Sequence, residues 1–297
     1  MLKKVNFIAT QCNLTFFPTF VQNTTSCHEF SSIMIIPFSK FHGTGNDFII
    51  IDNRSGQYSL SSETIENLCN RHTGIGADGL IMLELTDQGN YFMRYYNSDG
   101  KIATMCGNGG RCIASFAVMS GITENSFDFL AGDGWHHSKI QVLENGLFYV
   151  SLTMNDVKEY KKLTDGYYIH TGTPHFVQFR HYPDSYDINV DGSRIRYDDR
   201  FKPDGVNVNF ISLSDDVIQV RTYEKGVENE TLSCGTGVTA AALVSMLETG
   251  SKNKKHLIRT KGGSLSVEAD FNGELFTNII LHGPAQFVFS GKIKISS

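Results

Sequence analysis

Two cysteines, Cys106 and Cys234, each begin a glycine-rich motif that opens an apolar helix pattern. The first motif is CGNGG, residues 106–110, and the second is CGTG, residues 234–237. A thiol in the first turn of a helix lies beside unpaired backbone N–H groups and the positive end of the helix dipole, which favours the thiolate. The glycines leave room for a ligand at the same N–H groups. Each motif therefore predicts an anion site beside a reactive sulfur.

Such a pair of motifs suits the inversion of an amino acid at its α-carbon. Removal of the α-proton places negative charge on the neighbouring carboxylate, so N–H groups that already face this carboxylate stabilise the transition state more than the ground state. Inversion without a cofactor needs a base on one face of the carbon and an acid on the other, and a thiolate with a thiol supplies both. We therefore predict a cofactor-independent racemase or epimerase with Cys106 and Cys234 as its acid–base pair.

The segments around the two cysteines repeat one order of elements. Residues 94–100 precede the first cysteine and residues 221–226 the second, and each half reads as a strand, a polar loop with glycine, the cysteine motif and a helix of small and apolar residues closed by glycine. In one motif alone, a buried cysteine with tight-turn glycines would explain the same letters. Recurrence in both halves favours the catalytic interpretation and predicts two similar lobes with a cleft between them.

The remaining chemical signals in the sequence are weaker. Cys69 and Cys112 fall on apolar helix faces and are predicted as core residues, and all six cysteines are expected as free thiols. Residues 74–79, GIGADG, match the dinucleotide-binding pattern but run into a strand pattern instead of the helix that the pattern needs. His136 and His137 lack zinc-ligand spacing, and no lysine stands in the phosphate-binding context of a pyridoxal enzyme. No metal and no cofactor are predicted.

Composition and charge indicate a globular protein that binds a small molecule. The chain has 297 residues, a formal net charge of −5 and no basic footprint for nucleic acid. No apolar run approaches the roughly 20 residues that span a bilayer, and no secretion signal is recognisable, so a cytoplasmic location is expected. Residues 1–33 are interrupted by polar residues and proline and are predicted to be a flexible or dispensable leader. An optional start, a flexible arm and a weak organellar presequence are the alternatives for it.

The hydrophobic periodicity predicts the strands and helices that position the cysteine motifs. Strands are expected at residues 35–41 and 48–52 around a turn, at 80–85, 91–96 and 217–223, with mainly strands and turns from 127 to about 210 and short strands from 257 to 289. Helices are expected from Ser61 or Ser62 through Cys69, from Cys106 to a C-terminal Gly121, and from Val238 to Glu248 with Gly250 at its end. A helix that is apolar on most faces is usually enclosed, so each lobe is expected to wrap its sheet around its central helix. The predicted fold class is α+β.

Four segments resemble the diaminopimelate epimerase family: residues 42–48 (HGTGNDF), 71–79 (RHTGIGADG), 105–112 (MCGNGGRC) and 233–237 (SCGTG). The likeness extends from residue 34 to the end of the chain. It implies an isomerase of lysine and peptidoglycan-precursor biosynthesis that converts LL- to meso-diaminopimelate without pyridoxal phosphate. It also implies two pseudo-symmetric lobes, each a mixed sheet around a central helix: an N-terminal lobe at residues 34–154, to which strand 286–297 returns, and a C-terminal lobe at residues 155–285.

The resemblance assigns roles to residues through these motifs and their neighbours. It implies that Cys106 and Cys234 are the acid–base pair and that the reacting carboxylate is held by Gly107, Asn108, Gly235 and Thr236. It implies contacts to the substrate's amino groups and distal end from Asn46, Asn97, Asn207, Glu224 and Lys225, with His175 in a supporting place. Three positions depart from the commonest family pattern: Gly79 stands where glutamine is frequent, Thr173 where asparagine is frequent, and Lys225 where arginine is frequent. Lys225 can still pair with a distal carboxylate, but as a point charge rather than a bidentate fork.

Two alternatives remain open at this point. One is a proline or hydroxyproline racemase-like enzyme of the same fold, which would also use two cysteines. The other is a thiol-based binding or redox-sensing protein in which Cys106 and Cys234 form a reversible disulfide. In the favoured interpretation the partners are a small amino-acid substrate and, as an open option, a second copy of the chain in a homodimer. Nucleic acid and membranes are not expected as partners.

Overall fold

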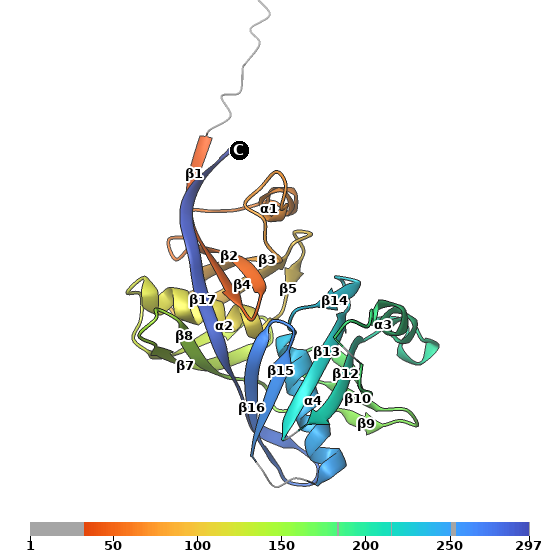
Figure 1. Ribbon diagram of the computed structural model, residues 1–297. Helices are drawn as coiled ribbons and strands as arrows, with labels where there is room; N and C mark the ends of the chain where they lie inside the picture. The colour runs from red at the N-terminus through yellow and green to blue at the C-terminus, as the bar shows by residue number, and fades with distance from the viewer. Residues whose placement is uncertain (1–32, 183, 215, 251–253, 297) are drawn as a thin grey trace, which may run out of the picture.

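The computed structural model describes residues 33–182, 184–214, 216–250 and 254–296. Within these residues the chain forms two lobes, each a curved sheet around one long helix (Figure 1). The predicted leader at residues 1–33 lies outside them, except that Ile33 begins the first strand. No helix in the described ranges is both long and apolar enough to cross a membrane.

The first lobe surrounds helix α2 (Gly107–Met119). Its strands are β1 (Ile33–Gly43), β2 (Asn46–Asp52), β3 (Gly79–Leu85), β4 (Tyr91–Asn97), β5 (Ile102–Ala103), β6 (Ser126–Ala131), β7 (Gly134–Val142) and β8 (Phe148–Thr153). Strand β2 pairs antiparallel with β1 and parallel with β3, so the sheet is mixed. Helix α1 (Ser62–Cys69) packs on the other face of this sheet through Ile65, Leu68 and Cys69. Helix α2 is buried from Gly107 to Ala117, which confirms the enclosed helix and the core position of Cys112.

The second lobe repeats this plan around helix α4 (Gly235–Thr249). Its strands are β9 (Tyr160–Lys162), β10 (Tyr167–His170), β11 (Pro174–Phe179), β12 (Asn207–Ser214), β13 (Val217–Glu224), β14 (Asn229–Thr231), β15 (Lys255–Thr260) and β16 (Gly263–Phe271). Strand β12 pairs parallel with β11 and antiparallel with β13. Helix α4 is buried from Gly235 to Met246. This arrangement confirms the predicted α+β fold of two pseudo-symmetric lobes.

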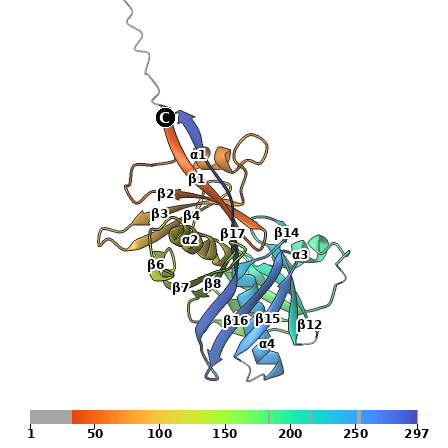
Figure 2. The same cartoon turned by 60° about the vertical axis from the view of Figure 1, so that its left-hand side comes forward.

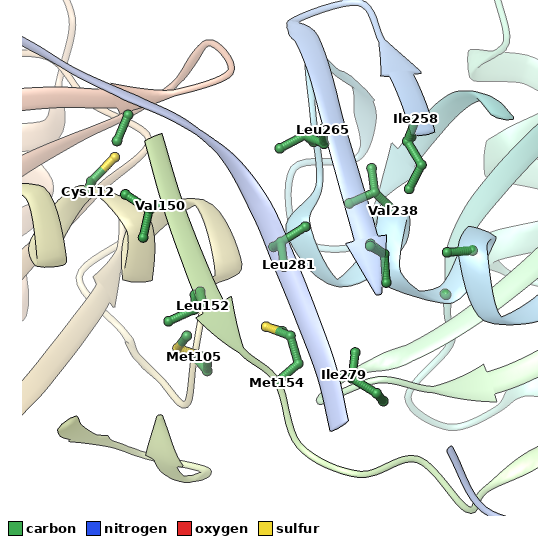
Figure 3. Packing of buried hydrophobic residues seen from close by; sticks show 14 of the residues in the cluster. Met105, Cys112, Val150, Leu152, Met154, Val238, Ile258, Leu265, Ile279 and Leu281 are labelled. Atoms are coloured by element: carbon green, nitrogen blue, oxygen red, sulfur yellow. The ribbon is translucent and has the colours of Figure 1, made fainter. Parts of the chain in front are cut away.

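One long strand, β17 (Phe276–Ser296), joins the lobes. It pairs with β16 of the second lobe, then with β8 and β1 of the first, and it runs across both lobes in two views (Figure 1 and Figure 2). Leu281 on this strand lies between Leu152 of β8 and Val238 of α4 (Figure 3). Buried residues of both lobes therefore form one continuous core, which holds the lobes against each other.

Three predictions about the elements were wrong in part. The region from residue 127 to about 210 also contains helix α3 (Asn189–Arg196) and a short 3₁₀ helix (Asp199–Phe201). Helix α3 buries Gly192 and Ile195 alone, so it shows no apolar period in the sequence. Helix α4 begins at Gly235 rather than Val238, because Cys234 caps it and the glycines form its first turn. Strand β17 is 21 residues long instead of several short strands, since it changes partners along its length.

Candidate active site

Cys106 and Cys234 occupy the same structural position in the two lobes. Each immediately precedes a helix, with an extended backbone of φ −139° and ψ 120° at Cys106 and of φ −120° and ψ 116° at Cys234. At such a cap position the side chain lies beside the first N–H groups of the helix, which lack intrahelical partners. The Gly109 N–H donates to the Cys106 sulfur at 3.5 Å. Both sulfurs thus lie at the anion-attracting end of a helix.

The N-termini of α2 and α4 meet at close range. A Cβ atom at Gly235 would lie 2.9 Å from the Gly107 Cα and 3.1 Å from the Asn108 nitrogen. Because non-bonded carbon atoms prefer about 3.5–4.0 Å, only glycine fits here without a shift of the backbone. Asn108 Nδ2 also donates to the Ser233 carbonyl oxygen, 3.0 Å away in the other lobe. The two glycine-rich turns that the sequence predicts as one anion site therefore lie together.

A cavity of about 380 Å³ lies at these helix N-termini. Its wall contains both cysteines and every residue predicted for substrate binding, namely Asn46, Asn97, Gly107, Asn108, Asn207, Glu224, Lys225, Gly235 and Thr236. An adjoining cavity of about 350 Å³ shares part of this wall: Asn46, Tyr95, Asn97, Cys106, Glu224, Lys225 and Ser233. A larger cavity of about 880 Å³ lies over β12 and β13 and contains none of the predicted residues. The two adjoining cavities are of the size that small ligands occupy.

Around Cys106, a carboxylate controls the orientation of Asn46. The Asn46 Nδ2 donates to Asp78 Oδ2 at 2.8 Å, which leaves its Oδ1 3.7 Å from the Cys106 Sγ. Asn108 Nδ2 donates to the same Oδ1 at 3.1 Å. The fully buried Arg111 donates to Asn108 Oδ1 at 2.9 Å and so holds the motif from behind. The Asn46 amide is therefore placed to accept a hydrogen bond from the Cys106 thiol.

Around Cys234, a chain of hydrogen bonds controls the Thr236 hydroxyl. Its Oγ1 lies 3.5 Å from the Cys234 Sγ and 3.0 Å from His175 Nε2. Thr222 donates to Asn209 Oδ1 at 2.9 Å, and Asn209 Nδ2 lies 2.9 Å from His175 Nδ1. An amide nitrogen can only donate, so the Nδ1 atom accepts and the Nε2 atom carries the ring proton. Burial lowers the pKa of His175 to about 3, and the neutral ring donates to Thr236, whose own proton is left for the sulfur or a bound carboxylate.

His175 thus lies behind the cavity wall rather than in it, where it orients a residue of the wall. Sequence reasoning also missed Asp78, Arg111 and Asn209. The first two stand inside motifs already singled out, at residues 71–79 and 105–112. Asn209 follows Asn207 by two positions on a strand, so the alternation alone places both on one face. No group of three or more His, Cys, Asp or Glu side chains suited to a metal occurs in the ranges that the structure describes.

We expected the helix N-termini to favour thiolates at Cys106 and Cys234, and for the protein without bound substrate this expectation was wrong. Burial raises the pKa of the Cys106 thiol to about 11, and the charge of Glu224 adds to the effect, against hydrogen bonds from the N–H groups of Gly109 and Asn108. Burial raises the pKa of Cys234 well above its ordinary range, again with a contribution from Glu224. Desolvation of the sulfurs outweighs the attraction of the helix ends. Both groups are therefore thiols near neutral pH.

Glu224 and Lys225, where β13 ends, bring a carboxyl and an ammonium group to the same cavities. Burial raises the pKa of Glu224 to about 7. The Lys225 Nζ forms no ion pair with any described residue, while its backbone N–H donates to Asn207 Oδ1 at 2.8 Å. Asn207 Nδ2 in turn donates to Thr173 Oγ1 at 2.9 Å, so the threonine at this departure from the family pattern holds the asparagine in place. The unpaired ammonium group is available for an anionic ligand.

The family model described as diaminopimelate epimerase matches residues 38–153 and 167–288 of this chain. The Flavobacterium psychrophilum protein named diaminopimelate epimerase is 46% identical over 257 residues, which is 86% of this chain and 98% of the relative. The Aquifex aeolicus protein of the same name is 40% identical over 276 residues, with 86% of this chain and 97% of the relative covered.

Solved structures share the fold at much lower sequence identity. A hydroxyproline epimerase from Agrobacterium vitis with bound trans-4-OH-L-proline superposes with a TM-score of 0.67 at 13% identity, covering 89% of this chain and 93% of its own. A PhzF-family phenazine biosynthesis protein from Bacillus anthracis gives a TM-score of 0.68 at 15% identity, covering 88% of this chain and 100% of its own. At these identities the likeness concerns the two-lobed fold alone.

Proposed function

The chain belongs to the diaminopimelate epimerase family, and we propose on this premise that it interconverts LL- and meso-diaminopimelate by proton transfer at Cα. The observation that carries the proposal is the placement of Cys106 and Cys234, each before a buried helix, on the wall of one cavity. An α-carbon bound between the two helix N-termini would face a sulfur on each side. The two thiols supply both proton transfers, so the reaction needs no cofactor.

In this proposal the α-carboxylate binds at the first residues of the two helices, Gly107 and Asn108 in one lobe and Gly235 and Thr236 in the other. One cysteine, as the thiolate, takes the α-proton and becomes a thiol. The electron pair left on Cα delocalises into the carboxylate, whose growing charge the backbone N–H groups stabilise. The other cysteine, as the thiol, gives its proton to the opposite face of Cα and becomes the thiolate. The α-carbon is inverted, and the two sulfurs exchange protonation states, so the reverse reaction uses them in opposite roles.

Substrate charge supports formation of the thiolate. Burial and the charge of Glu224 raise the pKa of both thiols in the protein alone. A bound α-ammonium group paired with Glu224 would neutralise the carboxylate that opposes ionisation of the sulfurs. The Thr236 hydroxyl, which already accepts from His175, can donate to the Cys234 sulfur. We therefore propose that, when the substrate binds, one thiol loses its proton to solvent and the active pair of one thiolate and one thiol forms.

The adjoining cavity supports a substrate with two polar ends. Lys225 lines both cavities without an ionic partner among the described residues, and a distal carboxylate would supply one. A proline-type substrate has no second end and would leave this charge without an ionic partner. The redox-sensor alternative has less support, since the chain matches the diaminopimelate epimerase family model and a ligand-sized cavity lies at both cysteines.

We also propose that the enzyme works as a homodimer in the cytoplasm, on the free amino acid of lysine and peptidoglycan-precursor synthesis. Four free cysteines in the described part of the chain support a reducing compartment. Exposed apolar side chains on strand β17, where it pairs with β1, support an interface there, with Val288 50% and Phe289 44% exposed. Phe289→Glu should then shift a sedimenting dimer to the monomer, and a wild-type protein that sediments as a monomer would contradict the interface.

Solvent deuterium exchange tests the reaction and its mechanism together. With LL-diaminopimelate in D₂O and no added cofactor, the wild type should form the meso isomer with deuterium at Cα. Cys106→Ala and Cys234→Ala should each abolish conversion while circular dichroism shows a native fold, because inversion needs both faces served. Cys112→Ala is the matched control, since it removes a buried thiol from the same helix as Cys106 outside the cavity. Normal turnover in either active-site variant would contradict the two-thiol mechanism, and faster turnover of proline or hydroxyproline would contradict the substrate.

A further inference from the structure

Tyr95 forms part of the wall between the two adjoining cavities, and no role was predicted for it. Its side chain lies on β4, is 8% exposed and lines both cavities. The ring packs edge-on against Phe48, with 5.9 Å between the ring centroids. This packing fixes the ring and leaves the hydroxyl end as the part that can reach a ligand.

Gly79 explains how the ring of Tyr95 reaches this place. In the antiparallel register of β3 and β4, Gly79 lies opposite Asn97, and Tyr95 is the next residue of β4 on the same face. A Cβ atom at Gly79 would lie 2.7 Å from the Tyr95 Cε2 and 3.4 Å from its hydroxyl oxygen. It would also lie 2.6 Å from the Tyr96 carbonyl oxygen. The phenol of Tyr95 therefore fills the space that a side chain at position 79 would take.

The hydroxyl of Tyr95 makes no hydrogen bond within the part of the chain that the structure describes. The hydroxyl oxygen is not among the fully buried polar atoms that lack a partner, so it is open to the cavities that the side chain lines. Burial raises the pKa of Tyr95 well above its ordinary value, and the nearby charges of Cys106, Glu224 and Asp78 add to the effect. The group therefore keeps its proton and remains a neutral donor beside three groups that carry or gain negative charge.

We propose that the Tyr95 hydroxyl hydrogen-bonds the bound substrate and is a specificity-determining group of this enzyme. The inference rests on the proposed diaminopimelate epimerase function and deepens it. A substrate that extends from the cysteine cavity into the adjoining cavity must pass Tyr95, because this residue lines both. The hydroxyl adds a directional contact to the point charge of Lys225, which by itself fixes the position of an anionic group poorly.

Tyr95→Phe removes the oxygen and keeps the ring that packs on Phe48. The KM for LL-diaminopimelate is expected to rise about tenfold, which corresponds to about 1.4 kcal/mol, with a change in kcat of less than about threefold. Because the hydroxyl has no described protein partner, the midpoint of thermal unfolding should stay the same or rise. Tyr96→Phe is the matched control, since Tyr96 is adjacent on β4 but packs against the cluster under helix α1. Its KM should equal that of the wild type.

Each outcome decides the inference. A KM of Tyr95→Phe within about twofold of the wild type would overturn it and leave the epimerase function standing, provided that the wild type converts the substrate. A lowered thermal midpoint with a matching fall in kcat would also overturn it, because the oxygen would then act on the fold. If the wild type neither bound nor converted diaminopimelate, the proposed function and this inference would fall together.

Discussion

Gly235→Ala tests whether the spacing of the two helix N-termini controls the reaction. The added methyl group would lie 2.9 Å from the Gly107 Cα, 3.1 Å from the Gly107 carbonyl carbon and 3.1 Å from the Asn108 nitrogen. These are backbone atoms of the other lobe, so no side chain can move aside. Since carbon atoms prefer about 3.5–4.0 Å, the helix ends must separate by roughly 0.6–1.1 Å.

That separation acts on the distance between Cys106 and Cys234 and on the carboxylate between them. A misplacement of about 1 Å in a catalytic constellation can cost roughly 100-fold in rate, so we expect kcat/KM for LL-diaminopimelate to fall by about 100-fold. Overpacking of this kind usually costs about 1–3 kcal/mol of stability, and alanine regains part of it through helix propensity. The variant should therefore stay folded, with a thermal midpoint a few degrees lower.

The matched control is Gly110→Ala, in the first turn of α2 but away from the contact between the lobes. Its Cβ atom would meet the Met105 Cε at 2.7 Å and the Leu152 Cδ2 at 2.8 Å, both ends of flexible side chains. Its kcat/KM should stay within about fivefold of the wild type. A Gly235→Ala enzyme as active as this control would refute the reasoning, because the lobes would then tolerate a wider gap without loss of catalysis.

Three further predictions concern the groups that face the cavities. Mild oxidation should join Cys106 and Cys234 in a disulfide that stops catalysis and that a dithiol reverses; peptide mapping of inactive enzyme with both thiols free would refute this. The KM for LL-diaminopimelate should rise as the pH falls below about 7, because burial raises the pKa of Glu224 to about 7 and protonation removes the partner of the substrate's ammonium group. A KM that stays flat from pH 8 to 6 would contradict that role. Lys225→Met should lower kcat/KM for diaminopimelate by about 10- to 100-fold, the worth of a charge-assisted hydrogen bond of about 1.5–3 kcal/mol, and an equal loss with proline would argue against distal recognition.

Local signals in the sequence were sufficient to predict the elements that carry the cysteines. The alternation of β-branched and aromatic residues predicts β2, β3 and β4 to within a few residues, and Ser61 caps α1 as expected. Gly250 closes α4 with a left-handed φ of 62°, the conformation that favours glycine. Such features depend on neighbours along the chain, so one sequence is enough to find them.

Elements without a local signature were found only in the structure. Helix α3 lacks an apolar period. The sequence of the 21-residue strand β17 does not indicate at which residues this strand changes from one partner strand to another. Asn209 and Arg111 act through buried contacts to His175 and Asn108, and burial depends on the packing of both lobes.

The sequence by itself was enough to pair Cys106 with Cys234. Each cysteine begins a copy of the same glycine-rich motif, and the same motif predicts the same local geometry. The sequence also determined the start of α2, predicted at Cys106 and observed at Gly107, whereas α4 begins at Gly235, three residues before the predicted Val238. Only the tertiary structure decided the ionisation of the two thiols. The helix dipole is a local property that can be read from sequence, whereas desolvation depends on everything that surrounds the sulfur, and here it raises the pKa of Cys106 to about 11. Likewise, the glycine at position 79 shows only that a side chain is missing, and the packed sheet shows that the phenol of Tyr95 takes its place.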